Sequence, residues 1–197
     1  MTTDWTRKME KRKALAEERA AQHTLEKGLL MVHTGSGKGK TTAALGLILR
    51  ALGHGFAVGL VQFVKGGWTS GELAALARFE DLVTVRVMGE GFTWETRDRA
   101  RDEAAARAAW SEAQTLLDDS RYRLIVLDEL TIALRYGFLD TAKVVAALNA
   151  RRPGLHVVVT GRNAPTELQA AADLVTEMVA IKHPYQAGLT AQPGVEY

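Results

Sequence analysis

Residues 29–52 read LLMVHTGSGKGKTTAALGLILRAL, and this stretch decides the fold. It begins with a short apolar run, continues through Gly35, Gly37 and Gly39, and then takes on a helical pattern. Glycines at a strand-to-helix turn let the backbone point successive amides inward, and the helix adds its positive N-terminal dipole. The stretch therefore predicts a loop that binds the phosphates of a nucleotide.

The residues after the last glycine give this loop its chemistry. Lys40 is predicted to contact phosphate oxygens and the Thr41 hydroxyl to ligate Mg²⁺, while Thr42 either binds phosphate or caps the helix. The standard pattern has a glycine where this chain has Thr34, so the loop is a variant form. The residues predicted to hold the nucleotide are Gly35, Ser36, Gly37, Lys38, Gly39, Lys40, Thr41 and Thr42.

Short apolar runs alternate with helical stretches beyond this loop. The runs are nearly continuous and rich in β-branched residues, as in strands that are covered on both faces. The alternation predicts an α/β fold with three layers and a mainly parallel sheet. Strands are expected at 29–33, 57–64, 83–88, 124–129, 156–160 and 174–181, and helices at 41–52, 72–80, 95–118, 140–151 and 165–172. Helix 41–52 is apolar almost all round, so we expect it in the interior.

Composition excludes several classes of protein. Of 197 residues, 47% are hydrophobic and 24% charged, which is typical of an ordinary globular domain and not of a disordered chain. Cysteine is absent, which excludes disulfides and thiolate chemistry, and the five histidines show no metal-ligand spacing. Because no apolar run could span a bilayer and the first 25 residues are highly charged, we expect a cytoplasmic protein without a membrane partner.

Charge is concentrated at the start of the chain. Residues 1–27 carry seven Lys/Arg and five Asp/Glu, which accounts for the whole net charge of +2. The rest lacks a concentrated basic face, so no nucleic-acid partner is expected. Residues 6–21 are helix formers with few large apolar side chains, which indicates either a solvated leader or a helix that orders on a ligand or partner subunit. We expect an N-terminal helical segment at 1–27 and one domain at 28–197.

An acidic pair follows another predicted strand. RLIVLDE, residues 123–129, places Asp128 and Glu129 where the strand leaves the sheet. Carboxylates at that edge can hold Mg²⁺ directly or through water. We therefore predict that Glu129 or Asp128 completes a metal site with Thr41; the alternative is a helix cap or a surface acidic pair.

Further loops leave strands at the same edge. QFVKGGWTSGE, residues 62–72, supplies Lys65, Trp68 and Glu72, and Arg162 and Asn163 follow the strand at 156–160. Because the carboxyl ends of parallel strands meet at one edge, these five residues are predicted to line the ligand site.

Two aromatic residues mark the segment 88–99, MGEGFTWETRDR. Phe92 and Trp94 either pack against a flat apolar ligand or anchor the following helix to the core. The C-terminal stretch from 182 to 197 is too interrupted for a helix and too apolar for a disordered end, so we expect it to fold over the body.

Taken together, these stretches resemble the P-loop ATP:corrinoid adenosyltransferases of cobalamin synthesis. The resemblance runs through HTGSGKGKTTAALG, QFVKGGWTSGE, GEGFTWETRDR, VLDELT, LNARRPGLHVVVTGRNAP and KHPYQAG, which cover nearly the whole chain. It implies a RecA-like P-loop fold, a homodimer, and transfer of the 5′-deoxyadenosyl group from ATP to the Co(I) of a reduced corrinoid, with release of triphosphate. It further implies Mg²⁺ or Mn²⁺ as cofactor and a reduced flavoprotein as electron donor.

The resemblance also implies roles for particular residues. Lys40 and Thr41 match the family's phosphate and Mg²⁺ contacts, Glu129 matches its acidic metal position, and Arg50 falls at a position near the nucleotide. One departure is Ser36, which stands where the family usually has Asn.

On the corrinoid side, Phe92 and Trp94 match the pair that packs under the corrin ring and displaces its lower axial ligand. With Lys40 they are the predicted catalytic residues. The family's N-terminal helix, here about 6–21, covers the corrinoid site. Two other functions remain as alternatives, namely a RecA-like P-loop ATPase and a non-catalytic corrinoid or ATP sensor.

Overall fold

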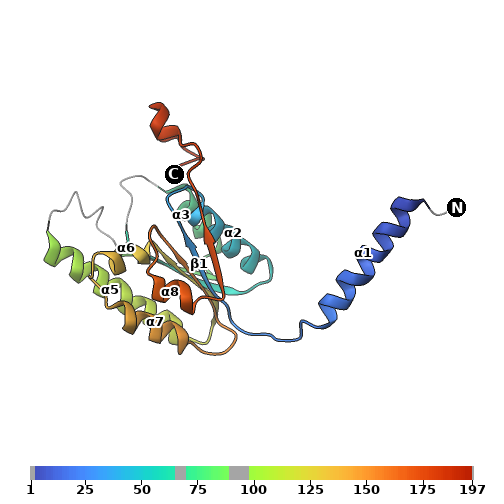
Figure 1. Ribbon diagram of the computed structural model, residues 1–197. Helices are drawn as coiled ribbons and strands as arrows, with labels where there is room; N and C mark the ends of the chain where they lie inside the picture. The colour runs from blue at the N-terminus through green and yellow to red at the C-terminus, as the bar shows by residue number, and fades with distance from the viewer. Residues whose placement is uncertain (1–2, 65–69, 89–97, 197) are drawn as a thin grey trace.

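The computed structural model describes residues 3–64, 70–88 and 98–196. Its centre is a six-stranded sheet in the order β3-β2-β4-β5-β1-β6, in which every pairing is parallel (Figure 1). The predicted α/β fold with a parallel sheet is therefore confirmed. The strands are β1 (Leu30–Thr34), β2 (Ala57–Gln62), β3 (Val83–Val87), β4 (Tyr122–Asp128), β5 (His156–Thr160) and β6 (Leu174–Glu177).

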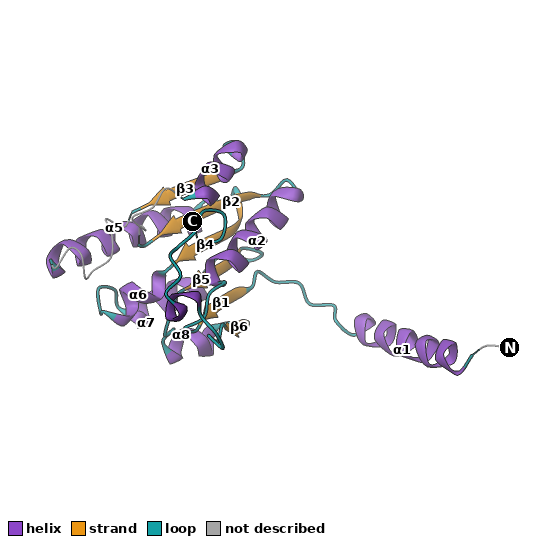
Figure 2. Ribbon diagram, turned by 90° about the horizontal axis from the view of Figure 1, so that it is seen from above, coloured by secondary structure: helices purple, strands orange, loops and turns teal. Residues whose placement is uncertain are grey.

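Helices cover both faces of the sheet and give the three predicted layers (Figure 2). One face packs against α2 (Lys40–Gly53) and α3 (Gly71–Leu76). The other face packs against α5 (Arg99–Asp118), α6 (Leu130–Arg135), α7 (Thr141–Asn149) and α8 (Thr166–Ala171). Two short 3-10 helices, η1 (Ala77–Phe79) and η2 (Pro184–Ala187), complete the body. Helix α6 was not predicted, because six residues are too few to show a helical period.

Helix α2 is not packed in the interior, so that prediction was wrong. Ala44, Ile48 and Leu52 are buried against the sheet, whereas Leu49 is 63% exposed and Arg50 is exposed. The helix forms an outer layer, and an outer layer buries only the stripe that faces the sheet. Apolar residues on its other face stay in contact with solvent in this chain.

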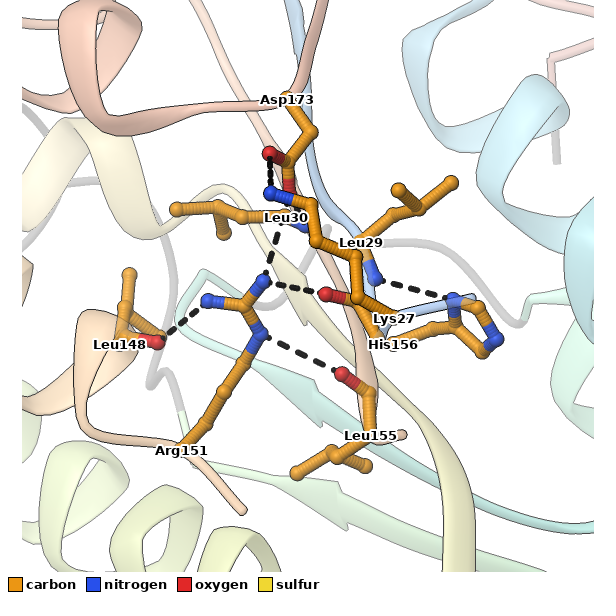
Figure 3. A network of polar contacts seen from close by, with 9 residues as sticks. Lys27, Leu29, Leu30, Leu148, Arg151, Leu155, His156 and Asp173 are labelled. Carbon is orange, nitrogen blue, oxygen red and sulfur yellow. Dashed lines mark hydrogen bonds and ion pairs between the residues drawn. The ribbon is translucent and has the colours of Figure 1, made fainter. Parts of the chain in front are cut away.

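A polar network fixes the edge of the sheet where β1, β5 and β6 begin (Figure 3). The Arg151 guanidinium donates to the carbonyls of Leu148 at 2.7 Å and Gly28 at 2.6 Å. Asp173 accepts from the Leu30 amide at 2.9 Å and pairs with Arg151 at 3.4 Å. These bonds join the segment that enters β1 to the segments that enter β5 and β6. They hold β1 in place, and with it the loop at its opposite end.

Helix α1 (Asp4–Ala21) lies apart from the body in both views (Figures 1 and 2). None of its residues is buried, and the Thr3 hydroxyl caps it by accepting from the Thr6 amide. Residues 1–27 thus contain a helix that has no apolar partner among the described residues. Within the described ranges, no helix combines the length and the apolar character needed to cross a membrane.

Candidate functional site

The predicted phosphate loop lies between β1 and α2, at the carboxyl edge of the sheet. Gly35 and Gly39 have φ of 99° and 107°, in the left-handed region that favours glycine. The Gly37 amide donates to the Met178 carbonyl at 2.6 Å, and the Met178 amide donates to the Thr34 carbonyl at 2.8 Å. A Cβ on Gly35 would lie 2.4 Å from that Met178 oxygen. The chain after β6 therefore braces the loop, which explains why the expected strand 174–181 ends at Glu177.

Lys40 lies on the inner side of this loop. Its side chain is buried, with the residue 8% exposed, and Nζ donates to the carbonyls of Gly35 at 2.9 Å and Gly37 at 2.8 Å. Burial lowers the pKa of Lys40, and the nearby Glu129 carboxylate opposes that effect. The ammonium group is held where the loop curves inward, so phosphate oxygens could replace the two carbonyls as its acceptors.

Asp128 is the centre of a buried hydrogen-bond group at the end of β4. It is 4% exposed and accepts from Thr160 Oγ1 at 2.6 Å, Thr41 Oγ1 at 3.0 Å and Gln62 Nε2 at 3.3 Å. Burial raises the pKa of Asp128, and these three donors oppose that effect. Because the Thr41 hydroxyl donates a hydrogen bond to Asp128, the lone pairs of its oxygen remain available to a cation.

Glu129 has an unusual backbone conformation for a residue with a side chain. Its φ of 59° and ψ of 25° are left-handed, and its amide donates to Thr160 Oγ1 at 2.9 Å. Burial raises the pKa of Glu129, as does the neighbouring Asp128, while Lys40 and Arg162 oppose the rise. A strained residue that carries a half-buried carboxylate beside a phosphate loop indicates a functional role for that carboxylate.

These oxygen donors fit Mg²⁺. Magnesium in nucleotide sites is held by one or two carboxylates together with substrate phosphates, and it keeps several waters. The Thr41 hydroxyl and the Glu129 carboxylate are donors of that kind, and Asp128 orients Thr41. Across the ranges that the structure describes, no group of three or more His, Cys, Asp or Glu could hold a metal alone. The arrangement suits an ion that arrives with a nucleotide.

Several of the predicted ligand-binding residues lie near this group. Glu72 is in the first turn of α3, and its charge raises the pKa of Asp128. Arg162 follows β5, and its charge acts on both Glu129 and Lys40. Asn163 has a left-handed φ of 53°. The charges of Glu72 and Arg162 thus act on the acidic pair, and their role in ligand binding stays a prediction.

Of the other predicted residues, Arg50 lies away from the phosphate loop, whereas Ser36, Lys38 and Thr42 lie at it. Arg50 is in the last turn of α2, and ten residues of helix separate it from Lys40 by about 15 Å. The chain therefore does not bring Arg50 to its own phosphate loop, because the helix axis leads away from it. Ser36, Lys38 and Thr42 have exposed side chains at the loop. The predictions for Lys65, Trp68, Phe92 and Trp94 fall outside the described residues.

Sequence reasoning missed residues that organise the site. Thr160 joins Asp128 to the Glu129 amide, Gln62 also donates to Asp128, and the Thr34 hydroxyl accepts from the Ala164 amide at 3.1 Å. A signal was available for Thr160, which ends the apolar run HVVVT at the same edge as the phosphate loop. A polar residue that closes a buried parallel strand lies at the ligand edge.

A family model described as ATP:corrinoid adenosyltransferase BtuR/CobO/CobP matches residues 26–197. The chain belongs to this family. Two corrinoid adenosyltransferases are similar over nearly the whole chain. The one from Pseudomonas aeruginosa is 53% identical over 190 residues, covering 96% of this chain and 94% of that protein. The one from Salmonella typhimurium is 42% identical over 193 residues, covering 98% and 97%. The predicted family is thereby confirmed, and the enzyme is a corrinoid adenosyltransferase.

A solved structure supports the fold of this adenosyltransferase. The flagellar accessory protein FlaH from Methanocaldococcus jannaschii superposes with a TM-score of 0.51, covering 78% of this chain and 72% of FlaH. Sequence identity is 10%, so the likeness shows the fold alone. FlaH therefore shares the predicted α/β fold.

Stability of the adenosyltransferase is expected to fall at mildly acidic pH because of His33 on β1. This residue is 6% exposed, and neither ring nitrogen has a hydrogen-bond partner among the described residues. Burial lowers the pKa of His33. The unfolded chain takes up the proton near pH 6.5 and the folded chain only at lower pH, so stability declines below ~6.5 by up to ~1.4 kcal/mol per pH unit.

Urea unfolding at pH 7.5 and pH 5.5 measures this effect on the wild type and on His33→Phe. The variant should lose part of the pH dependence, while His156, whose pKa is also lowered by burial, remains in both proteins. An identical pH dependence in the two proteins would show that His33 does not contribute.

Proposed function

We propose that this site transfers the 5′-deoxyadenosyl group of ATP to the Co(I) of a reduced corrinoid and releases triphosphate. The observation that carries the proposal is the juxtaposition of Lys40 in the phosphate loop with buried Asp128 and half-buried Thr41 and Glu129, in a chain of this family. Co(I) supplies an electron pair to the ribose C5′, a cobalt–carbon bond forms, and the C5′–O bond breaks. The electron pair of that bond leaves with the triphosphate.

The protein's task in this reaction is positioning and charge stabilisation. Co(I) is a strong nucleophile, so the site needs no Ser, Cys or His nucleophile and no general base. In this proposal, Lys40 Nζ and the N-terminus of α2 stabilise the negative charge that gathers on the leaving triphosphate. Holding C5′ in line with the cobalt supplies the remaining acceleration.

We assign the metal position to Thr41 and Glu129, with Asp128 as the residue that orients Thr41 through its hydrogen bond of 3.0 Å. Mg²⁺ or Mn²⁺ at this position would neutralise charge on the triphosphate oxygens. The three hydrogen bonds that Asp128 already accepts support Glu129 as the ligand, of the two carboxylates that the sequence left open.

The corrinoid side of the site is assigned from the resemblance. In this proposal, Phe92 and Trp94 pack under the corrin ring and displace its lower axial ligand, and residues 1–27 cover the corrinoid. Helix α1 buries none of its residues against the body, which supports a role in covering a ligand or a partner. The active form in this proposal is a homodimer, and a reduced flavoprotein supplies the electron that converts Co(II) to Co(I).

Replacing both Phe92 and Trp94 by Ala should lower turnover from Co(II) by about 10²-fold, because the corrinoid loses the surface that removes its lower ligand. ATP affinity should change little. Turnover is measured with cob(II)alamin and a chemical reductant, and ATP affinity by calorimetry. Equal losses in turnover and ATP affinity would contradict the proposed packing of Phe92 and Trp94 under the corrin ring.

Glu129 offers a test that separates strain from function. Glu129→Gly and Glu129→Gln should both raise the Mg²⁺ concentration needed for half-maximal activity by about tenfold or more. The ligand-free Glu129→Gly protein should also have a free energy of unfolding about 1 kcal/mol higher than that of Glu129→Gln. Glycine adopts the left-handed backbone conformation of this position without the strain that a side chain causes there. An unchanged metal requirement in Glu129→Gln would refute the metal assignment.

The reaction itself is tested by anaerobic incubation with MgATP and chemically reduced cob(I)alamin. A light-sensitive alkylcobalt spectrum with stoichiometric triphosphate is the expected result. Inorganic phosphate without a spectral change would instead indicate a P-loop ATPase, and ATP binding without a cobalt–carbon bond would indicate a sensor.

A further inference from the structure

The turn that follows β5, residues 161–164, is bonded at both of its ends to β1. The Gly161 amide donates to the His33 carbonyl, and the Ala164 amide donates to the Thr34 hydroxyl, each at 3.1 Å. Strand β1 leads directly into the phosphate loop. These two bonds therefore hold the ends of the turn beside that loop.

Thr131 on α6 holds the middle of the turn. Its hydroxyl donates to the Arg162 carbonyl at 2.9 Å, and the residue is fully buried. A helical threonine often donates to the carbonyl four residues earlier, as Thr115 on α5 does to Ser111. Thr131 instead donates to a carbonyl 31 positions away in the sequence. Because burying a hydroxyl costs free energy unless it is hydrogen-bonded, this bond explains a threonine where valine would fill the same space.

Gly161 lets two side chains approach the turn closely. A Cβ at this position would lie 2.0 Å from Thr131 Oγ1 and 3.1 Å from Glu129 Oε2. The hydroxyl that holds the turn and the carboxylate of the proposed metal position therefore lie on the same side of Gly161. Since Arg162 is the next residue, the Thr131 bond fixes where the Arg162 backbone lies relative to Glu129.

The Arg162 side chain is exposed at the ligand edge of the sheet. It lines a cavity of about 630 Å³ together with Lys38 of the phosphate loop. The other wall of this cavity is formed by part of residues 180–196, so the C-terminal stretch folds over the body as the sequence predicted. The charge of Arg162 acts on Lys40 and Glu129. A cation held here would add to that of Lys40 in stabilising a triphosphate.

We propose that Thr131 is a positioning residue for adenosyl transfer, which holds the turn so that the Arg162 guanidinium meets the leaving triphosphate. The inference rests on the proposed function, because it takes triphosphate as the leaving group. A guanidinium presents its N–H donors in a fixed planar fork, so its contact with phosphate oxygens depends on where the backbone places it. Loss of the Thr131 bond would leave the Arg162 carbonyl without this partner and the middle of the turn without its support.

A double-mutant cycle tests the proposal. The value of kcat/KM for ATP is measured with chemically reduced cob(I)alamin on the wild type, Thr131→Val, Arg162→Met and the double variant. Thr131→Val should lower kcat/KM by about tenfold, because small misplacements of a positioned group have large effects on rate. Arg162→Met should lower it further. The double variant should be no slower than Arg162→Met, because Thr131 acts through Arg162.

Two controls separate positioning from a general effect on the fold. Thr131→Ser keeps the hydroxyl and should react as the wild type does. Thr115→Val removes a hydroxyl bonded to a helix carbonyl at an exposed position of α5, and should leave kcat/KM unchanged. Urea unfolding of all variants should show that Thr131→Val lowers stability by the same amount with and without Arg162→Met, although its effect on kcat/KM disappears. Thr131→Ala replaces the valine variant if the latter does not fold.

Three results would overturn the proposal. A folded Thr131→Val protein with the kcat/KM of the wild type would show that the bond has no role in the reaction. Losses that multiply in the double variant would show that Thr131 acts independently of Arg162. A raised Mg²⁺ requirement in Thr131→Val, with Arg162→Met unaffected, would assign Thr131 to Glu129 instead. The proposed function is judged on the wild type alone, by whether a cobalt–carbon bond forms, so either idea can fail without the other.

Discussion

Lys40→Met should lower kcat/KM for ATP by about 10²- to 10³-fold, because it removes the buried ammonium group that faces the departing triphosphate. In the ligand-free protein Nζ binds the carbonyls of Gly35 and Gly37, and in the complex it would bind phosphate oxygens. Methionine keeps much of the length of the side chain and loses only the charge and its donors. The rate is measured as alkylcobalt formation with chemically reduced cob(I)alamin, which makes it independent of the electron donor.

Lys143→Met is the matched control for this variant. Lys143 is an exposed residue of α7, on the face of the sheet opposite to α2, and its replacement should leave kcat/KM unchanged. Circular dichroism shows whether Lys40→Met remains folded. A folded Lys40→Met protein with a rate close to that of the wild type would contradict the assignment of Lys40.

Thr160→Val should destabilise the protein by about 2–5 kcal/mol, because it deprives two buried groups of their partner. Thr160 is fully buried, donates to Asp128 at 2.6 Å and accepts from the Glu129 amide at 2.9 Å. Valine matches threonine in shape but can make neither bond. Losing this donor also raises the pKa of Asp128 further, which weakens its hold on Thr41.

Thr160→Ser separates the hydroxyl from the methyl group. It keeps both hydrogen bonds and loses about 1 kcal/mol for one buried methyl. Urea unfolding gives the free energies, and the Mg²⁺ dependence of adenosylation reports on Thr41. If Thr160→Val and Thr160→Ser were equally stable, the hydroxyl would have no organising role.

The layers and the phosphate loop could be predicted because each depends on local sequence. Continuous β-branched runs predicted strands at the positions where the structure has them, and Gly35, Gly37 and Gly39 before Lys40 predicted the loop. The strand 156–160 was predicted to the residue. Asp128 and Glu129 were placed at a strand end for the same reason.

What could not be predicted depends on contacts between distant segments. Met178 braces Gly37 across 141 positions of sequence, and Thr160 reaches Asp128 across 32, and no local pattern carries either contact. Helix α2 was misjudged because an apolar composition does not say whether a helix is covered on one side or on all sides. Its exposed Leu49 shows that only one side meets the sheet.

Transfer of the adenosyl group breaks the bond between C5′ and its oxygen in ATP. ATP labelled with ¹⁸O at the 5′ bridging position, incubated anaerobically with cob(I)alamin and the enzyme, tests this by mass spectrometry of the products. Attack of cobalt on C5′ predicts that the label leaves with the triphosphate and that the nucleoside on cobalt contains none. Label retained on the nucleoside, with inorganic phosphate or diphosphate as the other product, would show cleavage at phosphorus and rule out attack of cobalt on C5′.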